Sequence, residues 1–105
     1  MESLKHVTGI HPGISLQGFS LIYLYTDWCI PCAMMAPVLD NFSKSTNTTV
    51  IPVNIEKRPA EASIFEVYDI PTFILFKDAE VVWQHSGIIS ETTLREIVQS
   101  IQKTQ

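Results

Sequence analysis

The chain has little of several features that would point to other kinds of protein. Charged residues make up only 17% of its 105 residues, and the net charge of −4 comes without any run of basic residues. Nucleic acid and anionic membrane surfaces are therefore poor candidate partners. No stretch approaches the ~20 apolar residues that a membrane-spanning helix needs. We expect neither nucleic acid nor a membrane among the partners of this protein.

The N-terminal segment lacks the central apolar block of a secretory signal peptide. Glu2, Lys5, His6 and His11 interrupt it with charged and polar side chains. The Met at position 1 favours an intact start over a chain whose signal has been removed. The expected location is therefore the cytoplasm.

Cysteine is scarce as well, since the chain contains only Cys29 and Cys32. Two cysteines are too few for a disulfide scaffold, and a domain of this size does not need one. The hydrophobic content is 46%, and a chain of this length buries roughly two-thirds of its unfolded surface. We expect one domain over residues 1–105 and a chemical role for the cysteine pair.

Apolar patterning predicts strands that alternate with helices. The expected strands cover residues 4–8, 19–26, 50–55, 72–76 and 81–85. The expected helices cover residues 30–44, a segment that starts at Pro59, and a segment capped by Ser90. A strand, a helix and a strand at this spacing form a parallel pair with a right-handed crossover. The expected fold class is therefore α/β, a central mixed sheet with helices on both faces.

Each expected helix carries one apolar stripe. The stripes are Met35, Val38, Leu39 and Phe42; Ala60, Ile64, Val67 and Tyr68; and Leu94, Ile97, Val98 and Ile101. Pro37 lies inside the first helix and should kink it. Residues 43–49 are expected to form a polar loop.

Cys29 and Cys32 are separated by two residues, a spacing that suits thiol–disulfide exchange. A strand that ends at Thr26 delivers Cys29 to the start of the following helix, where unpaired N–H groups and the helix dipole favour a thiolate. The thiolate is the nucleophile in disulfide exchange. Cys32 lies one turn deeper and should be less exposed. We therefore expect Cys29 to attack the disulfide of a partner and Cys32 to resolve the mixed disulfide.

Two other interpretations of the cysteine pair remain open. The first is a purely structural disulfide, although closing so short a loop stabilises a protein by only about 2 kcal/mol. The second is half of a zinc site, which needs four ligands. Against it, His6, His11 and His85 show no ligand-like spacing to one another or to the cysteines.

The segment Trp28-Cys29-Ile30-Pro31-Cys32 resembles the active-site motif of the thioredoxin family. Further along, Ile70-Pro71-Thr72 is similar to the cis-proline loop that faces the cysteines in that family. Pro37 matches its helix-kinking proline, and Gly87 matches a glycine that borders its substrate groove. The resemblance covers over four-fifths of the chain and implies a thioredoxin-like fold with thiol–disulfide oxidoreductase activity.

The resemblance also implies roles for individual residues. Cys29 and Cys32 would be catalytic. The implied substrate-binding residues are Trp28, Ile30, Pro31, Ile70, Pro71 and Gly87. Among these, Trp28 would pack beside the cysteines, Ile70 would offer backbone hydrogen bonds to an extended substrate, and Pro71 would be cis.

Partners and cofactors follow from the same resemblance. The substrates would be disulfide-bonded proteins, and the electrons would come from an upstream donor similar to thioredoxin reductase. No bound cofactor and no metal is expected, and the chain is expected to be a monomer.

The sequence departs from the family pattern beneath the cysteines. Thioredoxins usually carry a buried aspartate where this chain has Tyr23, and a lysine where it has Pro52. Since neither residue can accept a proton near neutrality, water or another carboxylate would have to take the proton that Cys32 loses. We expect slow resolution, with a rate that climbs above pH 7. Asp27 and Asp69 would either make the rim of the site acidic or simply be solvated.

Three functions are compatible with these residues. The leading one is a cytoplasmic reductant of protein disulfides. The second is an oxidase or isomerase, because Ile30 replaces the usual glycine and the dipeptide between the cysteines can shift the reduction potential. The third is a thioredoxin-like binding module, against which the intact cysteine pair argues.

Overall fold

The computed structural model describes residues 18–65 and 69–103. The elements are β1 (Phe19–Tyr25), α1 (Ile30–Thr46), β2 (Thr49–Asn54), α2 (Pro59–Ile64), β3 (Thr72–Lys77), β4 (Glu80–Ser86) and α3 (Glu91–Lys103). The four strands and α1 each begin and end within two residues of an expected element. Helix α2 begins at Pro59 and α3 follows Ser90, as expected, whereas their C-terminal ends were not predicted. The expected strand at 4–8, together with Val67 and Tyr68, lies outside the described residues.

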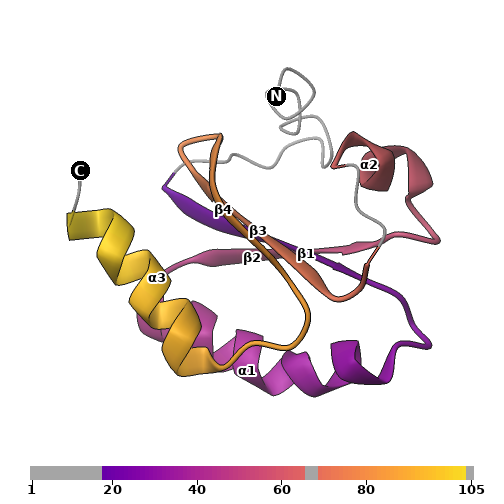
Figure 1. Ribbon diagram of the computed structural model, residues 1–105, viewed down its shortest axis with the longest axis horizontal. Coiled ribbons are helices and arrows are strands. Elements are labelled where there is room, and N and C mark those ends of the chain that lie inside the picture. The colour runs from indigo at the N-terminus through magenta and orange to yellow at the C-terminus, as the bar shows by residue number, and fades with distance from the viewer. Residues whose placement is uncertain (1–17, 66–68, 104–105) are drawn as a thin grey trace.

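One sheet of four strands in the order β2-β1-β3-β4 forms the centre of the described fold. β1 pairs with β2 in parallel and with β3 antiparallel, and β3 pairs with β4 antiparallel. Helices α1 and α3 cover one face and α2 lies over the other (Figure 1). The sheet is therefore mixed, and the expected α/β class is confirmed.

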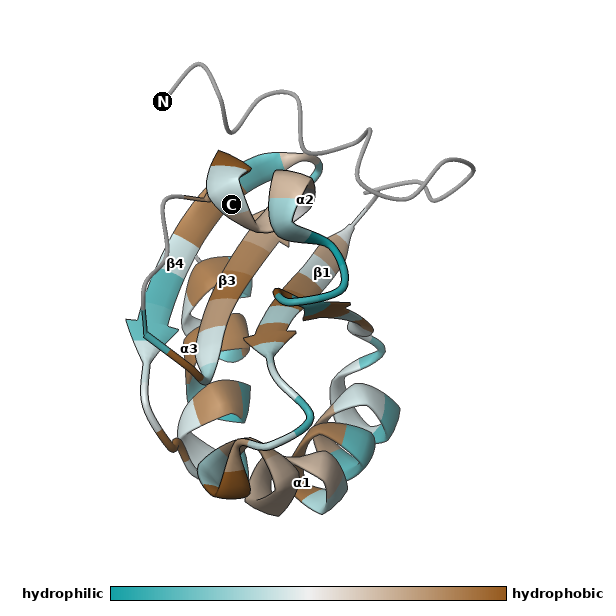
Figure 2. Ribbon diagram, turned by 90° about the vertical axis from the view of Figure 1, so that its right-hand side faces the viewer, coloured by the Kyte–Doolittle hydropathy of each residue, from teal (hydrophilic) through white to brown (hydrophobic). Residues whose placement is uncertain are grey.

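The two faces of the sheet come from alternate residues of the same strands. On β1, Leu21 and Tyr23 join the core beneath α1 and α3, whereas Ile22 and Leu24 join the core beneath α2. Because successive side chains of a strand point to opposite faces, an apolar run such as β1 can fill both cores. Figure 2 shows β3 coloured as hydrophobic along most of its length, and β1 as hydrophobic with paler bands.

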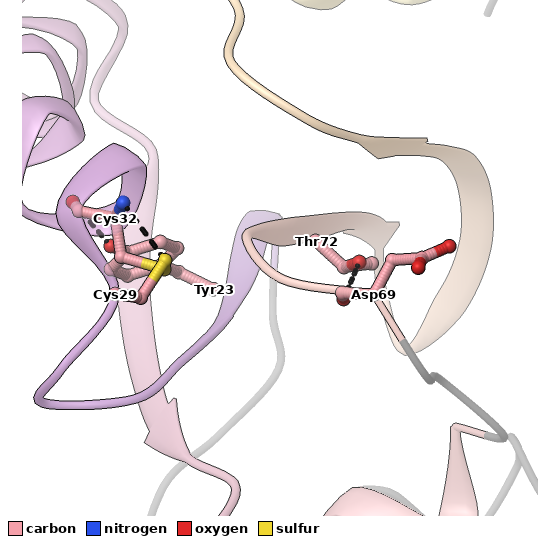
Figure 3. Close-up of a disulfide and its surroundings, with 5 residues drawn as sticks. All are labelled: Tyr23, Cys29, Cys32, Asp69 and Thr72. Carbon is pink, nitrogen blue, oxygen red and sulfur yellow. Dashed lines mark hydrogen bonds between the residues drawn. A yellow bond between two sulfur atoms is a disulfide. The ribbon is translucent and has the colours of Figure 1, made fainter.

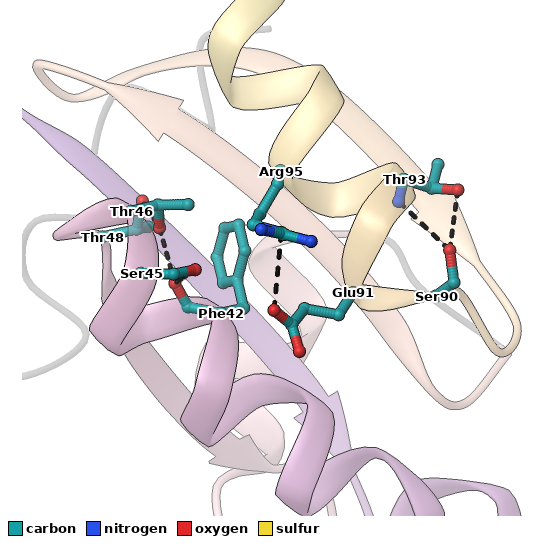
Figure 4. A network of polar contacts seen from close by, with 8 residues as sticks. All are labelled: Phe42, Ser45, Thr46, Thr48, Ser90, Glu91, Thr93 and Arg95. Atoms are coloured by element: carbon teal, nitrogen blue, oxygen red, sulfur yellow. Dashed lines mark hydrogen bonds and ion pairs between the residues drawn. The ribbon is translucent and has the colours of Figure 1, made fainter.

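Helix α1 extends two residues beyond the expected end at Lys44 and shortens the expected loop. The hydroxyl groups of Ser45 and Thr46 donate to the Phe42 carbonyl oxygen at 3.2 and 2.7 Å (Figure 4). Asn47 then adopts a left-handed conformation with φ 56°, which is a common way to end a helix. The polar composition of residues 43–49 thus reflects the end of a helix rather than a loop alone.

Helix α3 begins at the expected cap. The Ser90 hydroxyl oxygen accepts a hydrogen bond from the backbone N–H of Thr93 at 3.1 Å (Figure 4). One turn into the helix, Glu91 and Arg95 form an ion pair at 3.4 Å. Leu94 and Val98 are buried against the core, so the apolar stripe faces the sheet as its spacing predicts.

Candidate active site

The cysteine pair lies at the junction between β1 and α1. Cys29 is the N-cap residue of α1, with an extended backbone (φ −83°, ψ 109°). It forms a disulfide with Cys32, and its sulfur also accepts the backbone N–H of Cys32 at 3.2 Å. One N–H group of the first helical turn, that of Cys32, therefore points at the Cys29 sulfur, which favours negative charge there.

Both cysteines are buried in this disulfide form. Cys29 is 6% exposed and Cys32 is 2% exposed. The order agrees with the expectation that Cys32 is the deeper residue, but Cys29 is less exposed than its expected role suggests. The Cys29 sulfur is bonded to Cys32, and both residues belong to the same core cluster.

The two residues that flank Cys29 in the chain carry large apolar side chains that are exposed. Trp28 is 68% exposed and Ile30 is 75% exposed. Met34 and Ile88 are the other large apolar residues that the described surface leaves exposed. Trp28 therefore adds to the surface beside the cysteines instead of packing into the core.

Tyr23 occupies the position beneath the cysteines where the family usually has an aspartate. Its hydroxyl donates to the Cys32 carbonyl oxygen at 2.7 Å (Figure 3). Its ring stacks on Tyr25 and Phe73, with centroid distances of 5.2 and 5.4 Å. Burial, with a smaller contribution from Tyr25, raises the pKa of Tyr23 to about 12. Tyr23 is therefore a hydrogen-bond donor near neutrality and not a base.

Pro52 lies directly across from Tyr23. The two residues are partners in the parallel pairing of β1 with β2. The two positions that depart from the family pattern are thus neighbours in the sheet, and together they leave neither a carboxylate nor an ammonium group there.

A cavity of about 230 Å³ lies beside the cysteines. It is lined by Tyr23, Tyr25, Thr26, Asp27, Cys29, Cys32, Ala33 and Ala36. The carboxylate of Asp27 is held by Asn54, whose amide nitrogen donates to it at 3.1 Å, and by the Lys57 ammonium at 3.3 Å. The sequence left Asp27 as either an acidic rim residue or a solvated one, and it gave no signal for Asn54 or Lys57.

The proline loop precedes β3. The Ile70–Pro71 peptide bond is cis, as the resemblance predicts. The Pro71 carbonyl oxygen accepts the backbone N–H of Gly87 at 2.8 Å, so the loop is tied to the end of β4. Ile70 packs against the core cluster that contains both cysteines. Two of the expected groove residues, Ile70 and Gly87, are half-buried, whereas Pro71 itself is buried.

Thr72, the last residue of the Ile70-Pro71-Thr72 motif, secures the same loop through its hydroxyl, a role that the sequence did not predict. Its hydroxyl donates to the Asp69 carbonyl oxygen at 2.6 Å (Figure 3) and lies 2.9 Å from the Ser86 hydroxyl. A threonine that opens a strand gives no sequence signal of this kind, because the contact depends on how the loop folds back.

The family model for thioredoxin matches residues 14–102. The chain belongs to the thioredoxin family. Known relatives agree: a thioredoxin from Buchnera aphidicola is 33% identical over 87 residues, covering 81% of each chain. A thioredoxin from Chlamydia caviae is 37% identical over 82 residues, covering 77% of this chain and 80% of the relative. With the Cys29–Cys32 pair in place, the protein is a thiol–disulfide oxidoreductase.

Solved thioredoxin structures share the fold. A mutant thioredoxin from Halobacterium salinarum superimposes with a TM-score of 0.78 at 31% identity, covering 95% of this chain and 83% of that one. Mitochondrial thioredoxin 3 from Saccharomyces cerevisiae, in its oxidised form, gives 0.74 at 26% identity, covering 82% and 81%.

The described residues contain neither a membrane-spanning helix nor a cluster of metal ligands. Within residues 18–65 and 69–103, no helix is long and apolar enough to span a membrane. Over the same ranges, no three histidine, cysteine or acidic side chains gather as a metal site would require.

Proposed function

We propose that this thioredoxin works as a reductant of protein disulfides, with Cys29 as the attacking thiol and Cys32 as the resolving thiol. The observation that carries the proposal is the placement of Cys29 at the N-cap of α1, with its sulfur 3.2 Å from the Cys32 N–H. In the reduced protein this arrangement stabilises a thiolate on Cys29 in particular.

The reaction transfers two electrons from the dithiol to the substrate. The Cys29 thiolate attacks one sulfur of the substrate disulfide, that bond breaks, and the released thiolate takes a proton from solvent. Cys32 then loses its proton and attacks the Cys29 sulfur. The second substrate thiolate leaves, and the Cys29–Cys32 disulfide forms. A donor similar to thioredoxin reductase returns two electrons to the pair.

Substrate binding is assigned to the surface around the disulfide. The exposed side chains of Trp28, Ile30 and Pro31 offer an apolar platform. The backbone at Ile70, beside cis Pro71, would pair with an extended substrate segment. Gly87 has φ 101° and nothing within 4 Å of where a Cβ would lie, which leaves room for that segment.

The assignment of the two thiols is tested by alkylating the reduced protein near pH 7. Cys29 should react much faster than Cys32, because only a thiolate near the surface is alkylated quickly. Mass spectrometry of the two cysteine-containing peptides over time gives both rates. Equal rates would contradict the roles assigned here.

The direction of electron flow is tested by the reduction potential. Thioredoxin-like couples extend from about −270 mV to about −120 mV. A value below about −250 mV supports the reductant, whereas one above about −180 mV would support the oxidase or isomerase instead.

We also propose that the protein is located in the cytoplasm, since dithiols stay reduced there. We further propose that it is a monomer. Cell fractionation and sedimentation velocity test those two statements.

A further inference from the structure

In the resolving step the buried Cys32 thiol must lose a proton, and a group must accept it. Cys32 is 2% exposed, and burial of a thiol disfavours its ionised form. Tyr23 does not take the proton, because its hydroxyl already donates to the Cys32 carbonyl oxygen and burial raises its pKa to about 12. The proton must therefore leave Cys32 by another route.

The cavity beside the cysteines offers such a route. Both Cys32 and Asp27 line it, and Asp27 is the one carboxylate among the described residues that do so. The other titratable groups at its wall are Tyr23 and Tyr25 of β1 and the thiols themselves. Helix α1 contributes Ala33 and Ala36, which do not titrate. Of these groups, a carboxylate is the natural acceptor for a proton released into the cavity.

A second observation points to water in the cavity. Thr26 also lines it and is only 2% exposed, yet its hydroxyl has no hydrogen-bond partner within the part of the chain that the structure describes. Buried hydroxyl groups are nearly always hydrogen-bonded, and ordered water supplies the partner where protein does not. The cavity volume of about 230 Å³ is ample for several water molecules.

The carboxylate is held in place at the cavity wall. Asn54 donates to one Asp27 oxygen and Lys57 pairs with the other. Asn54 is itself fixed, because its side-chain oxygen accepts the backbone N–H groups of Glu56 and Lys57 at 3.0 and 3.2 Å. The Asp27 side chain is still 64% exposed, so a proton that it receives can pass to solvent.

We propose that Asp27 accepts, through water bound at the Thr26 hydroxyl, the proton that Cys32 loses as it resolves the mixed disulfide. The proposal rests on the proposed function. The proton moves from the Cys32 thiol to cavity water, and water passes a proton to the Asp27 carboxylate. The Cys32 thiolate attacks Cys29, the substrate thiolate leaves and is protonated by solvent, and Asp27 releases its proton to solvent.

The test is single-turnover reduction of dipyridyl disulfide, an uncharged probe that releases one absorbing thiopyridone when Cys29 attacks and a second when Cys32 resolves. In Asp27→Asn the second release should slow by about a hundredfold at pH 7, the low end of what a general base contributes. The first release should change by less than about twofold. The deficit should shrink as pH rises, because hydroxide replaces the carboxylate.

Asp40→Asn is the matched control. Asp40 also pairs with a lysine, Lys44, and its side chain is likewise 64% exposed. It does not line the cavity, so both releases should keep their rates. Asp27→Glu should recover most of the second release, because it restores a carboxylate.

Thr26→Val tests the water separately. It removes the hydroxyl at nearly constant volume and should slow the second release about threefold, since water loses one of its partners. An unchanged second release in Thr26→Val would overturn the part of the proposal that concerns water.

The direction in which Asp27→Asn changes the rate of the second release distinguishes a proton acceptor from a residue that acts only through its charge. If Asp27 acted only through its charge, its loss would favour the thiolates and speed the second release. An unchanged or faster second release would therefore overturn the proposal. Two other results would contradict the proposed function instead. The first is a parent protein that releases no thiopyridone, and the second is a Cys29→Ser variant that still gives the first release.

Discussion

The face of the sheet beneath α1 and α3 differs from the face beneath α2 in what its buried side chains do. The first holds both cysteines and Tyr23, whose hydroxyl bonds to the Cys32 carbonyl. The buried members of the second are aliphatic side chains and phenylalanines: Ile22, Leu24, Ile51, Val53, Phe65, Ile74 and Phe76. Alternate residues of one strand thus serve chemistry on one face and stability on the other.

The difference between the two faces shows how a small domain combines an active site with a stable core. The active-site face contains polar groups that must be satisfied, such as the Tyr23 hydroxyl, and borders a cavity of about 230 Å³. Buried polar groups cost free energy unless they are hydrogen-bonded, so they add less stability than apolar side chains of similar size. The apolar face under α2 offsets this cost, since its side chains only pack.

The largest effect should follow from changing the active-site face at Cys29. Cys29→Ser should abolish disulfide reduction, because serine is not a comparable nucleophile for sulfur, while the fold remains. Cys32→Ser should instead trap mixed disulfides with substrates. Reduction of a disulfide-bonded protein and non-reducing electrophoresis measure the two outcomes. Residual turnover in Cys29→Ser would show that Cys29 is not the attacking thiol and that the chemistry of this face does not depend on it.

A change on the opposite face should affect stability alone. Leu24 is fully buried beneath α2, so Leu24→Ala should lower the free energy of unfolding by about 2–5 kcal/mol. The rate of each redox step, measured on the folded fraction, should not change. Urea unfolding and single-turnover kinetics check these values. A changed rate at Cys29 would mean that the two faces are coupled.

A smaller loss should follow from removing one hydroxyl on the active-site face. Tyr23→Phe keeps the ring stacked between Tyr25 and Phe73 and removes only the bond to the Cys32 carbonyl. The free energy of unfolding should fall by about 1 kcal/mol. Thermal unfolding of the oxidised forms tests this. A loss as large as that in Leu24→Ala would show that Tyr23 does more than hold the first turn of α1.

The same residue predicts a pH dependence. The folded pKa of Tyr23 is raised to about 12, against about 10 for an unfolded tyrosine. The stability that its neutral form contributes is therefore complete below pH ~10 and is lost as pH rises towards ~12. The difference in stability between the oxidised parent and Tyr23→Phe should shrink over that window. A constant difference would contradict the assigned burial.

The smallest effect should occur in the turn between β3 and β4, where Asp78 is exposed. The Asp78 carboxylate accepts the backbone N–H of Gly18 at 2.8 Å and pairs with Lys77 at 3.0 Å, and these contacts lower its pKa. Asp78→Asn should lower the melting temperature slightly at neutral pH. The difference should vanish as pH falls below ~4, because protonation removes the same charge from the parent. A difference that persists in acid would require another cause.

Local patterns predicted the elements well, and their errors lie at the ends. The end of α1 was placed at Lys44, because hydroxyl residues there are typical of a loop as well as of a helix terminus. The hydroxyl groups of Ser45 and Thr46 instead bond back to Phe42 and extend the helix. The cis bond at Ile70–Pro71 was expected only from the resemblance to thioredoxins, because local sequence does not select that isomer.

The strands, the helices and the dithiol could be predicted from the sequence, since each depends on periodicity or on residues within one helical turn. The sequence also showed that Tyr23 and Pro52 stand where the family usually has an aspartate and a lysine. The order of the strands and the contacts of Tyr23 and Asp27 came from the tertiary structure. The Tyr23 bond to Cys32 spans 9 residues and the Asn54 bond to Asp27 spans 27. Such contacts depend on how strands and turns pack, which no local pattern encodes.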